Sequence, residues 1–460
     1  MMIYKICKNR PKTLLFTLLT MFFAVLPTNQ TFAQFEYMAE AMHPEYLVRD
    51  LVTFAEGLNL DDTQEVIVEA MFDSYEDDFE SGWAATQERL NTIAEDIKKN
   101  NPTSQKETLE PVLNALSDWL IEKRQLDDGL LENVQVILVG HQRELWPGFS
   151  RQLYREKHMR RGRLSGESVD LFQIVRDTDL SPAAESRISD YLEEYAFTLD
   201  GAMRNRDAIL RGNPKKLFDN ILSDNTHQSP ERVDKEIHAR IEIRDLNDRY
   251  IEIISGNLVS TDGENFRTRA LKRGYSRIYR RTPAQRILRQ AAENENYDEG
   301  LKVQIIQLEA SYLQELGILN FNLLELTRNY EPKRHRSRLL AGQVRKSGGT
   351  PQKIEDPTRV LYKDRETLGK RYIEMLQALL TPEQFLELDG SRRWAPQDKQ
   401  IYERPQSPVT GKDGALSLTD GSAEDKGKGK SKGVGGNSSG RQPQGGTSAT
   451  KKGSNLGGPR

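Results

Sequence analysis

The chain has a single cysteine among its 460 residues, and this residue, Cys7, lies near the N-terminus. Loss of the N-terminal segment would leave no thiol. Disulfides, thiol nucleophiles and thiolate metal sites are then excluded from the mature chain. A chain without disulfides has to be stabilised by packing alone.

Apolar residues are scarce as well. Hydrophobic residues make up 36% of the chain and charged residues 29%. This balance fits an elongated, helix-rich structure better than a thick-cored enzyme. Alternating, strand-like patterns are rare, and no stretch after the N-terminal segment is long and apolar enough to span a membrane.

The N-terminal segment has the pattern of a secretory signal peptide. Four basic residues precede an apolar run from Leu14 to Leu26, and the small residue Ala33 follows a few positions later. The run is shorter than the roughly 20 residues that cross a bilayer. We therefore expect residues 1–33 to be cleaved and the protein to be periplasmic or secreted; an uncleaved anchor is the alternative. Removing the four basic residues takes the formal charge from −3 to −7, which does not favour nucleic acid as a partner.

From Glu36 to about Trp394, apolar residues recur three and four positions apart, which is the period of amphipathic helices. The sequence predicts an all-α fold of tandem long-helix repeats, packed as helical hairpins or a bundle. Residues 396–460 are rich in Gly, Ser and Lys and cannot bury enough apolar surface to offset the entropy lost on ordering. We expect them to form a disordered C-terminal tail, and we expect a shorter linker around residues 345–357.

Three segments align without gaps when the tyrosines at positions 75, 195 and 312 are superposed. Each segment begins fifteen residues before its tyrosine with an apolar or aromatic residue and an N-cap residue: Leu60-Asp61, Leu180-Ser181 and Tyr297-Asp298. The apolar stripe that follows each start lies on one helical face, so we expect its tyrosines and methionines to pack in the core.

A second stretch repeats with the same period. Leu246-x-x-Arg249-Tyr250-Ile251-Glu252 recurs as Leu368-x-x-Arg371-Tyr372-Ile373-Glu374, an interval of 122 residues. A distant counterpart in the first unit is expected around Leu131 to Leu138. A period near 120 in two independent stretches predicts three helical units, 34–165, 166–285 and 286–395.

The sequence shows no convincing motif for catalysis or cofactor binding. The GxSxG pattern of a nucleophile elbow occurs only in the Gly/Ser/Lys-rich tail, at residues 429–433 and 436–440, where no strand-to-helix turn is expected. The six histidines do not pair at the i, i+3 or i, i+4 spacing of two ligands on one helix face. We expect no catalytic residues, no cofactor and no resident metal, and hence no enzyme. His141 and His158, 17 residues apart in a basic region, are the candidates for a metal-sensing site under the alternative hypothesis.

The stretch Leu380-Thr381-Pro382-Glu383-Gln384 resembles the LTxxQ signature of the periplasmic Spy/CpxP family. In that family the motif occurs twice per chain and opens helices of a small all-α protein that dimerises into a curved cradle. Its members are ATP-independent chaperones or envelope-stress regulators, and some relatives sense heavy metals. The resemblance therefore implies a helical envelope protein and a homodimer.

Weaker copies of the motif occur elsewhere in the chain. The first unit keeps the leucine and glutamine at Leu60 and Gln64, and again at Leu138 and Gln142. The second unit keeps Leu180-Ser181-Pro182 but has Ala184 in place of the glutamine, and Thr282 to Gln285 carries the threonine and glutamine after an arginine.

Our leading hypothesis is an exported, all-helical module that binds other envelope proteins or unfolded clients, with a chaperone or envelope-stress role. The groove between the repeat helices would bind them, and exposed aromatic residues would contact the client: Trp83, Trp119 and Trp146. Two alternatives stay open. One is a metal-responsive sensor, and the other is a structural scaffold whose basic tail tethers it to an anionic envelope surface.

Overall fold

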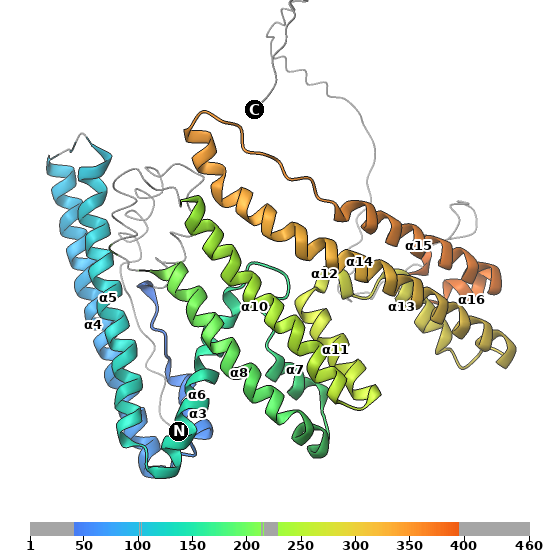
Figure 1. The fold of residues 1–460 in the computed structure, drawn as a ribbon, viewed down its shortest axis with the longest axis horizontal. Coiled ribbons are helices and arrows are strands. Elements are labelled where there is room, and N and C mark those ends of the chain that lie inside the picture. The colour runs from blue at the N-terminus through green and yellow to red at the C-terminus, as the bar shows by residue number, and fades with distance from the viewer. Residues whose placement is uncertain (1–40, 101, 103, 213–214, 216–228, 395–460) are drawn as a thin grey trace, which may run out of the picture. The chain divides into compact units, whose positions relative to one another are not determined.

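The computed structural model describes residues 41–100, 102, 104–212, 215 and 229–394. All regular structure in these ranges is helical, and no strand occurs in them (Figure 1). The prediction of an all-α fold is confirmed. In the described part of the chain, no helix is both long enough and apolar enough to cross a membrane. The expected signal peptide and the expected tail lie outside the described residues.

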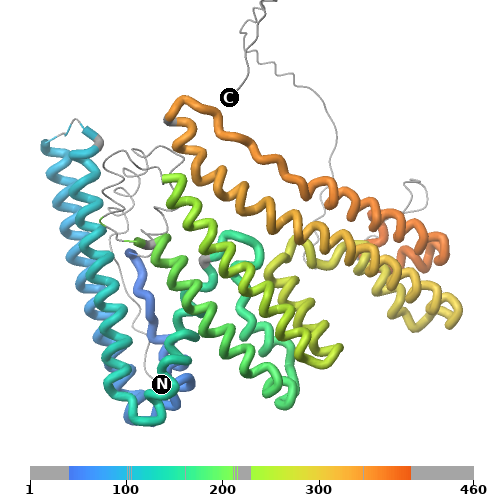
Figure 2. Tube along the Cα trace, in the orientation of Figure 1, coloured from blue at the N-terminus to red at the C-terminus, as the bar shows by residue number. Residues whose placement is uncertain are grey.

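The helices follow one order three times: a short helix, two long helices that form a hairpin, and a further shorter helix. The first round is α3 (Leu51–Leu58), α4 (Asp62–Asn100), α5 (Gln105–Ile137) and α6 (Gly140–His158). The second is α7 (Leu171–Thr178), α8 (Pro182–Arg211), α10 (Pro230–Asn257) and α11 (Ser260–Gly274). The third is α13 (Pro283–Ala292), α14 (Glu299–Lys346), α15 (Thr358–Leu379) and α16 (Pro382–Leu386). In Figure 2 the two long tubes of each hairpin lie side by side, and they pack on each other.

Single turns connect or end these rounds. They are η1 (Val48–Asp50) before α3, η2 (Met159–Arg161) after α6, α12 (Ser276–Tyr279) between α11 and α13, and η3 (Ser391–Trp394) after α16. The expected linker around residues 345–357 corresponds to the non-helical connection between α14 and α15. The expected boundary between residues 285 and 286 falls inside α13 and is corrected, because Thr282 caps that helix and begins the third round.

Each first long helix starts where the sequence predicts. The side-chain oxygen of the N-cap accepts a hydrogen bond from the backbone N–H three residues later: Asp61 from Gln64 (2.9 Å), Ser181 from Ala184 (3.3 Å) and Asp298 from Leu301 (3.0 Å). These bonds satisfy backbone donors that the first helical turn leaves free. Thr381 caps α16 in the same way and forms a capping box with Gln384.

The three repeat tyrosines are buried, as expected, and their hydroxyl groups have a shared role. Each hydroxyl bonds to the segment that enters the short helix: Tyr75 to the N–H of Glu45 (3.0 Å), Tyr195 to the carbonyl of Val169 (3.2 Å) and Tyr312 to the Thr282 hydroxyl (2.6 Å). Burial raises the pKa of each phenol, so the hydroxyl stays protonated.

The first two tyrosines also bond to the second long helix of their hairpin. Tyr75 donates to Asp127 on α5 (2.6 Å), and Tyr195 shares its one hydroxyl proton between the Val169 carbonyl and Asn247 Oδ1 on α10 (2.9 Å). The corresponding position on α15 is Gly369, which has no side chain to offer. The hydroxyl thus fixes the position of the short helix relative to the hairpin.

The repeated Arg-Tyr pair has the same geometry in both copies. The guanidinium lies over the ring of the following tyrosine, at 5.3 Å for Arg249 on Tyr250 and at 5.2 Å for Arg371 on Tyr372. These tyrosines pack against Tyr195 and Tyr312 with ring centroids 5.2 Å and 5.3 Å apart. The sequence repeat is therefore also a repeat of contacts.

The first-unit counterpart of this stretch lies elsewhere than expected. Because Asp127 meets its tyrosine as Asn247 does, the stretch aligns with residues 126–134 and not with Leu131 to Leu138. Leu130 and Val134, at the positions of Tyr250 and Ile254, are both buried. The correction follows from a match of contacts that residue identity does not reveal.

Helices α4 and α5 pack closely against each other at Gly82. A Cβ atom on Gly82 would lie 2.3 Å from the ring of Trp119, which is 1% exposed. The ring cannot easily move, because its Nε1 donates to the carbonyl of Ala41 at 2.7 Å. The glycine is required here for close packing of the two helices.

We predict that Gly82→Ala lowers the free energy of unfolding by about 1–3 kcal/mol, the usual cost of overpacking a core. The matched control is Gly129→Ala in α5, where an added Cβ meets nothing within 4 Å. That variant should gain about 0.5–1 kcal/mol, because alanine loses less backbone entropy in a helix. Urea unfolding followed by circular dichroism measures both, and equal effects of the two substitutions would contradict the packing argument.

Candidate functional site

The two motif-like stretches of the first unit meet in space. Gln64 and Gln142 exchange side-chain amide hydrogen bonds, with Gln64 Nε2 donating at 2.8 Å and Gln142 Nε2 donating at 2.7 Å. Each amide also donates to a backbone carbonyl, Gln64 to Ile137 (3.1 Å) and Gln142 to Asn59 (2.9 Å). Both N–H bonds of each amide are therefore used, and the pair serves to join two helix connections.

The second unit has a motif position that sequence reasoning missed. Leu138, Leu258 and Leu380 each follow the second long helix of a hairpin in extended conformation, and all three are buried. They lie 120 and 122 residues apart. The period itself could have revealed Leu258, but Val259 and Asp262 replace the threonine and glutamine that define the motif. Thr282, which carries the motif's threonine in the sequence, does not follow the second long helix but caps α13.

The expectation that tryptophans form an exposed contact surface is wrong for two of the three. Trp83 and Trp119 are 8% and 1% exposed and pack against each other in the core of the α4–α5 hairpin. Trp146 is partly buried beside Phe149. A client could not reach the first two without opening the hairpin.

The two histidines considered for metal sensing do not share a site. They lie at opposite ends of α6, about 25 Å apart along the helix axis. His141 is exposed, whereas His158 is buried, stacks on Tyr154 and lies with Nδ1 2.9 Å from Asp207. Within the described ranges, no group of three or more His, Cys, Asp or Glu side chains is arranged to hold a metal ion.

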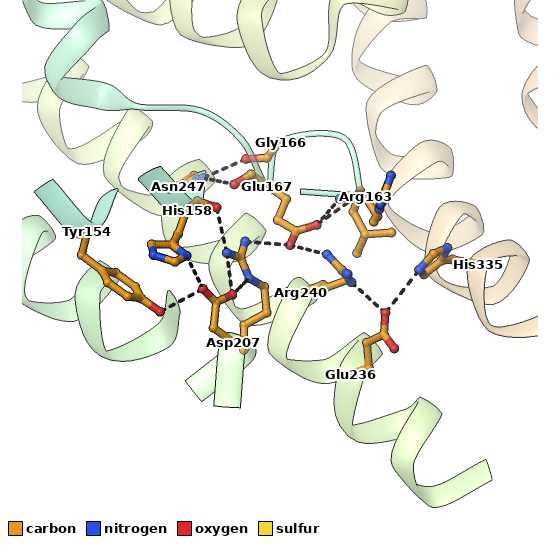
Figure 3. A network of polar contacts seen from close by, with 12 residues as sticks. Tyr154, His158, Arg163, Gly166, Glu167, Asp207, Glu236, Arg240, Asn247 and His335 are labelled. Carbon is orange, nitrogen blue, oxygen red and sulfur yellow. Dashed lines mark hydrogen bonds and ion pairs between the residues drawn. The ribbon is translucent and has the colours of Figure 1, made fainter. Parts of the chain in front are cut away.

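A buried network of charged groups centres on Glu167, in the loop between η2 and α7 (Figure 3). Glu167 is fully buried. One oxygen of its carboxylate pairs with the guanidinium of Arg206 on α8 at 3.3 Å and with that of Arg240 on α10 at 3.0 Å. The backbone N–H groups of Arg163 and Leu164 donate to its other oxygen at 2.6 Å and 3.0 Å. One carboxylate thus compensates two buried cations and shapes its own loop.

Two further carboxylates extend the network on either side of Glu167. Asp207 accepts from Arg206 (2.9 Å), and Glu236 accepts from Arg240 (3.1 Å). Burial disfavours the ionised form of Asp207, but the hydrogen bond from His158 and the charge of Arg206 outweigh it and hold its pKa below the usual value. Burial likewise opposes ionisation of Glu236, yet the contact with His335 and the charge of Arg240 hold its pKa below the usual value.

The loop around Glu167 also bonds to the third round of helices. The backbone N–H and the hydroxyl of Ser165 both donate to the carboxylate of Glu331 on α14, each at 2.8 Å. His335 on α14 lies 3.7 Å from Glu236, too far for a hydrogen bond but close enough for electrostatic attraction. The network therefore connects helices from all three rounds and is best explained as a structural junction.

One helix face has the character of a binding surface. On α14 the residues Val303, Ile306, Leu313, Ile318 and Phe321 are 45%, 52%, 39%, 60% and 60% exposed. Ala310 and Gly317 lie exposed between them. From residue 303 to residue 322 the only charged side chains are Glu309, which is buried, and Glu315. We call these seven apolar residues the uncharged face of α14.

A groove adjoins this face where α14 packs on α15. It has a volume of about 330 Å³, and Ile318, Leu319 and Leu368 form its apolar part. Its charged lining residues are Glu315 and Arg371, which form an ion pair, and Asp364. Exposed apolar surface beside a small groove is typical of protein-binding sites.

Comparisons of the chain with profiles of protein families, with curated proteins and with solved structures found no match. The resemblance to the LTxxQ family thus stays a prediction that rests on the motif residues.

We predict that Glu167→Gln destabilises the protein by about 3–5 kcal/mol, because two buried guanidinium groups lose their shared counter-charge. Asp118→Asn is the control. It removes an ion pair with Arg89 in which both side chains are more than half exposed, and such pairs contribute about 0–1 kcal/mol. Chemical unfolding of both variants tests the difference, and a loss below 1 kcal/mol for Glu167→Gln would show that the junction is not structural.

A second prediction concerns acid. The folded-state pKa of Asp207 is depressed, so its ionised form contributes stability above the unfolded pKa, and this contribution is lost as pH falls through the folded pKa. The difference in unfolding free energy between the native chain and Asp207→Asn should therefore shrink as pH falls from 7 to 3.

Asp127 is the opposite control, because burial raises its pKa. The difference between the native chain and Asp127→Asn should grow as pH falls. Urea unfolding at several pH values measures both slopes. Slopes of the same sign would contradict the assigned environments.

Proposed function

We propose that this protein is an exported, all-helical protein-binding module that holds apolar segments of other proteins on the uncharged face of α14. The supporting observation is the face itself: seven apolar residues exposed over five turns of one helix, in a chain of which 29% is charged. Soluble proteins seldom leave such a surface uncovered unless it binds something.

An ATP-independent chaperone or envelope-stress role suits this surface. An apolar, uncharged face binds apolar segments without any hydrogen-bond pattern specific to one sequence, which is what a holding chaperone needs. The periplasmic or secreted location, expected from the signal-like N-terminus, and the homodimer, expected from the family resemblance, are parts of the same proposal.

The chain with both Ile306→Glu and Phe321→Glu tests the proposal. At equimolar ratio, the native chain should suppress aggregation of a reduced, unfolded client in a light-scattering assay, and the double variant should lose at least half of that suppression. Both positions are exposed, so helix content by circular dichroism should stay the same.

Phe197→Glu is the matched control, because Phe197 on α8 is a single apolar residue that is 72% exposed. It should leave suppression unchanged. Absence of suppression by the native chain would refute the chaperone role, and equal suppression by all three proteins would refute the assignment to α14.

A further inference from the structure

The uncharged face of α14 has the residue spacing of a coiled-coil seam. Six of its seven members follow one another at steps of three, four, three, four and four residues: Val303, Ile306, Ala310, Leu313, Gly317 and Phe321. The seventh, Ile318, lies to one side of this line. This spacing keeps side chains in line with a second helix that crosses at a shallow angle. An extended segment would instead match a repeat of two residues, and α14 does not offer one.

Gly317 is not needed by the packing within the chain. It lies inside a helix of 48 residues, where glycine is less favourable than alanine, and an added Cβ would meet nothing within 4 Å. Ala310 lies one heptad earlier. The two small residues alternate with Ile306, Leu313 and Phe321, so the face presents holes one heptad apart between larger side chains. Holes of this kind accept large side chains from a facing helix.

The groove beside Ile318 adds a third hole on one side of the seam. Its volume of about 330 Å³ and its apolar part can take one aliphatic or aromatic side chain. The charged residues that line the groove are Glu315 and Arg371, which pair with each other, and Asp364. The apolar part formed by Ile318, Leu319 and Leu368 favours an apolar anchor residue in the partner.

Charge decides which flanking residues the partner can have. Apart from Glu315, which is paired with Arg371, the exposed polar residues beside the seam are uncharged: Gln304, Gln307, Ser311, Gln314 and Asn322. A charged side chain facing them would lose water without gaining an opposite charge, which is costly. Uncharged flanks suit this face best.

From these observations we infer that the uncharged face of α14 binds an amphipathic helix of another protein. The seam from residue 303 to residue 321 is about 27 Å long, which matches a helix of about 18 residues. The partner helix carries large apolar residues at heptad spacing, opposite Ala310 and Gly317, and uncharged flanks. This inference rests on the proposed function and names the conformation of the bound segment.

The probe is a labelled synthetic helix of about 21 residues, with leucine at the two seam positions of each heptad, glutamine and serine beside them, and charges only on the far side. A peptide of the same composition in scrambled order is the comparison. With the full chain, fluorescence anisotropy should show at least tenfold tighter binding of the heptad peptide.

Gly317→Leu separates a partner site from a structural role. It should raise the thermal stability of the chain, because leucine is the better helix former, and weaken binding of the heptad peptide at least tenfold by filling the hole. Gly201→Leu in α8 is the matched control, since that glycine is also helical, exposed and surrounded by open space. It should give a similar stability gain and unchanged binding.

Three results would overturn the inference. Equal affinity for the scrambled peptide would mean that the face takes apolar segments of any conformation. Self-association in sedimentation that Gly317→Leu abolishes would mean that a second copy of this chain is the occupant. If the peptide does not bind but client aggregation is still suppressed, the inference of a helical partner is refuted and the proposed function is not. Peptide binding without suppression would instead remove the chaperone role alone.

Discussion

A hydrogen bond from a buried tyrosine hydroxyl is the interaction on which each repeat depends. An unpaired hydroxyl in the core would cost about 1–3 kcal/mol, so the entering segment has to lie where it can bond to that group. Tyr195 shows how far the constraint reaches. Its partner Asn247 also donates to the carbonyl of Gly166 at 2.8 Å, and this contact holds the loop that carries Glu167. In the second unit, the Tyr195 hydroxyl therefore positions the short helix, the hairpin and the charged junction relative to one another.

The parts of the fold that the sequence predicts are those that short-range chemistry decides. Asp61, Ser181 and Asp298 were predicted as helix starts because an N-cap acts on an amide only three residues away. The tyrosine stripes were predicted because helical periodicity and a period near 120 residues are visible in one dimension. The heptad spacing and the scarcity of charge between residues 303 and 322 of α14 can also be read in the sequence, but which face of this helix is exposed follows only from the structure.

The remaining features depend on contacts between distant positions. Glu167 meets Arg206 and Arg240, which lie 39 and 73 residues away, and no local pattern identifies a carboxylate that shares two cations. Trp119 was expected at the surface, but Gly82 on the neighbouring helix makes room for its ring. Nothing in the sequence around either residue states which helix faces which, so packing partners of this kind could not be predicted.

The paired glutamines affect the order in which parts of the protein unfold in acid. Gln64 and Gln142 are neutral at every pH, so protons have no effect on their hydrogen bonds, and salt has little. The junction around Glu167 includes Asp207 and Glu236, whose pKa values are depressed, so it weakens in acid. Acidification should therefore release the contacts among the rounds of helices first, while the end of the first hairpin stays closed. The protein would pass through a state of loosened but still folded hairpins. Protection of backbone amides from hydrogen exchange would be lost first around the Glu167 loop.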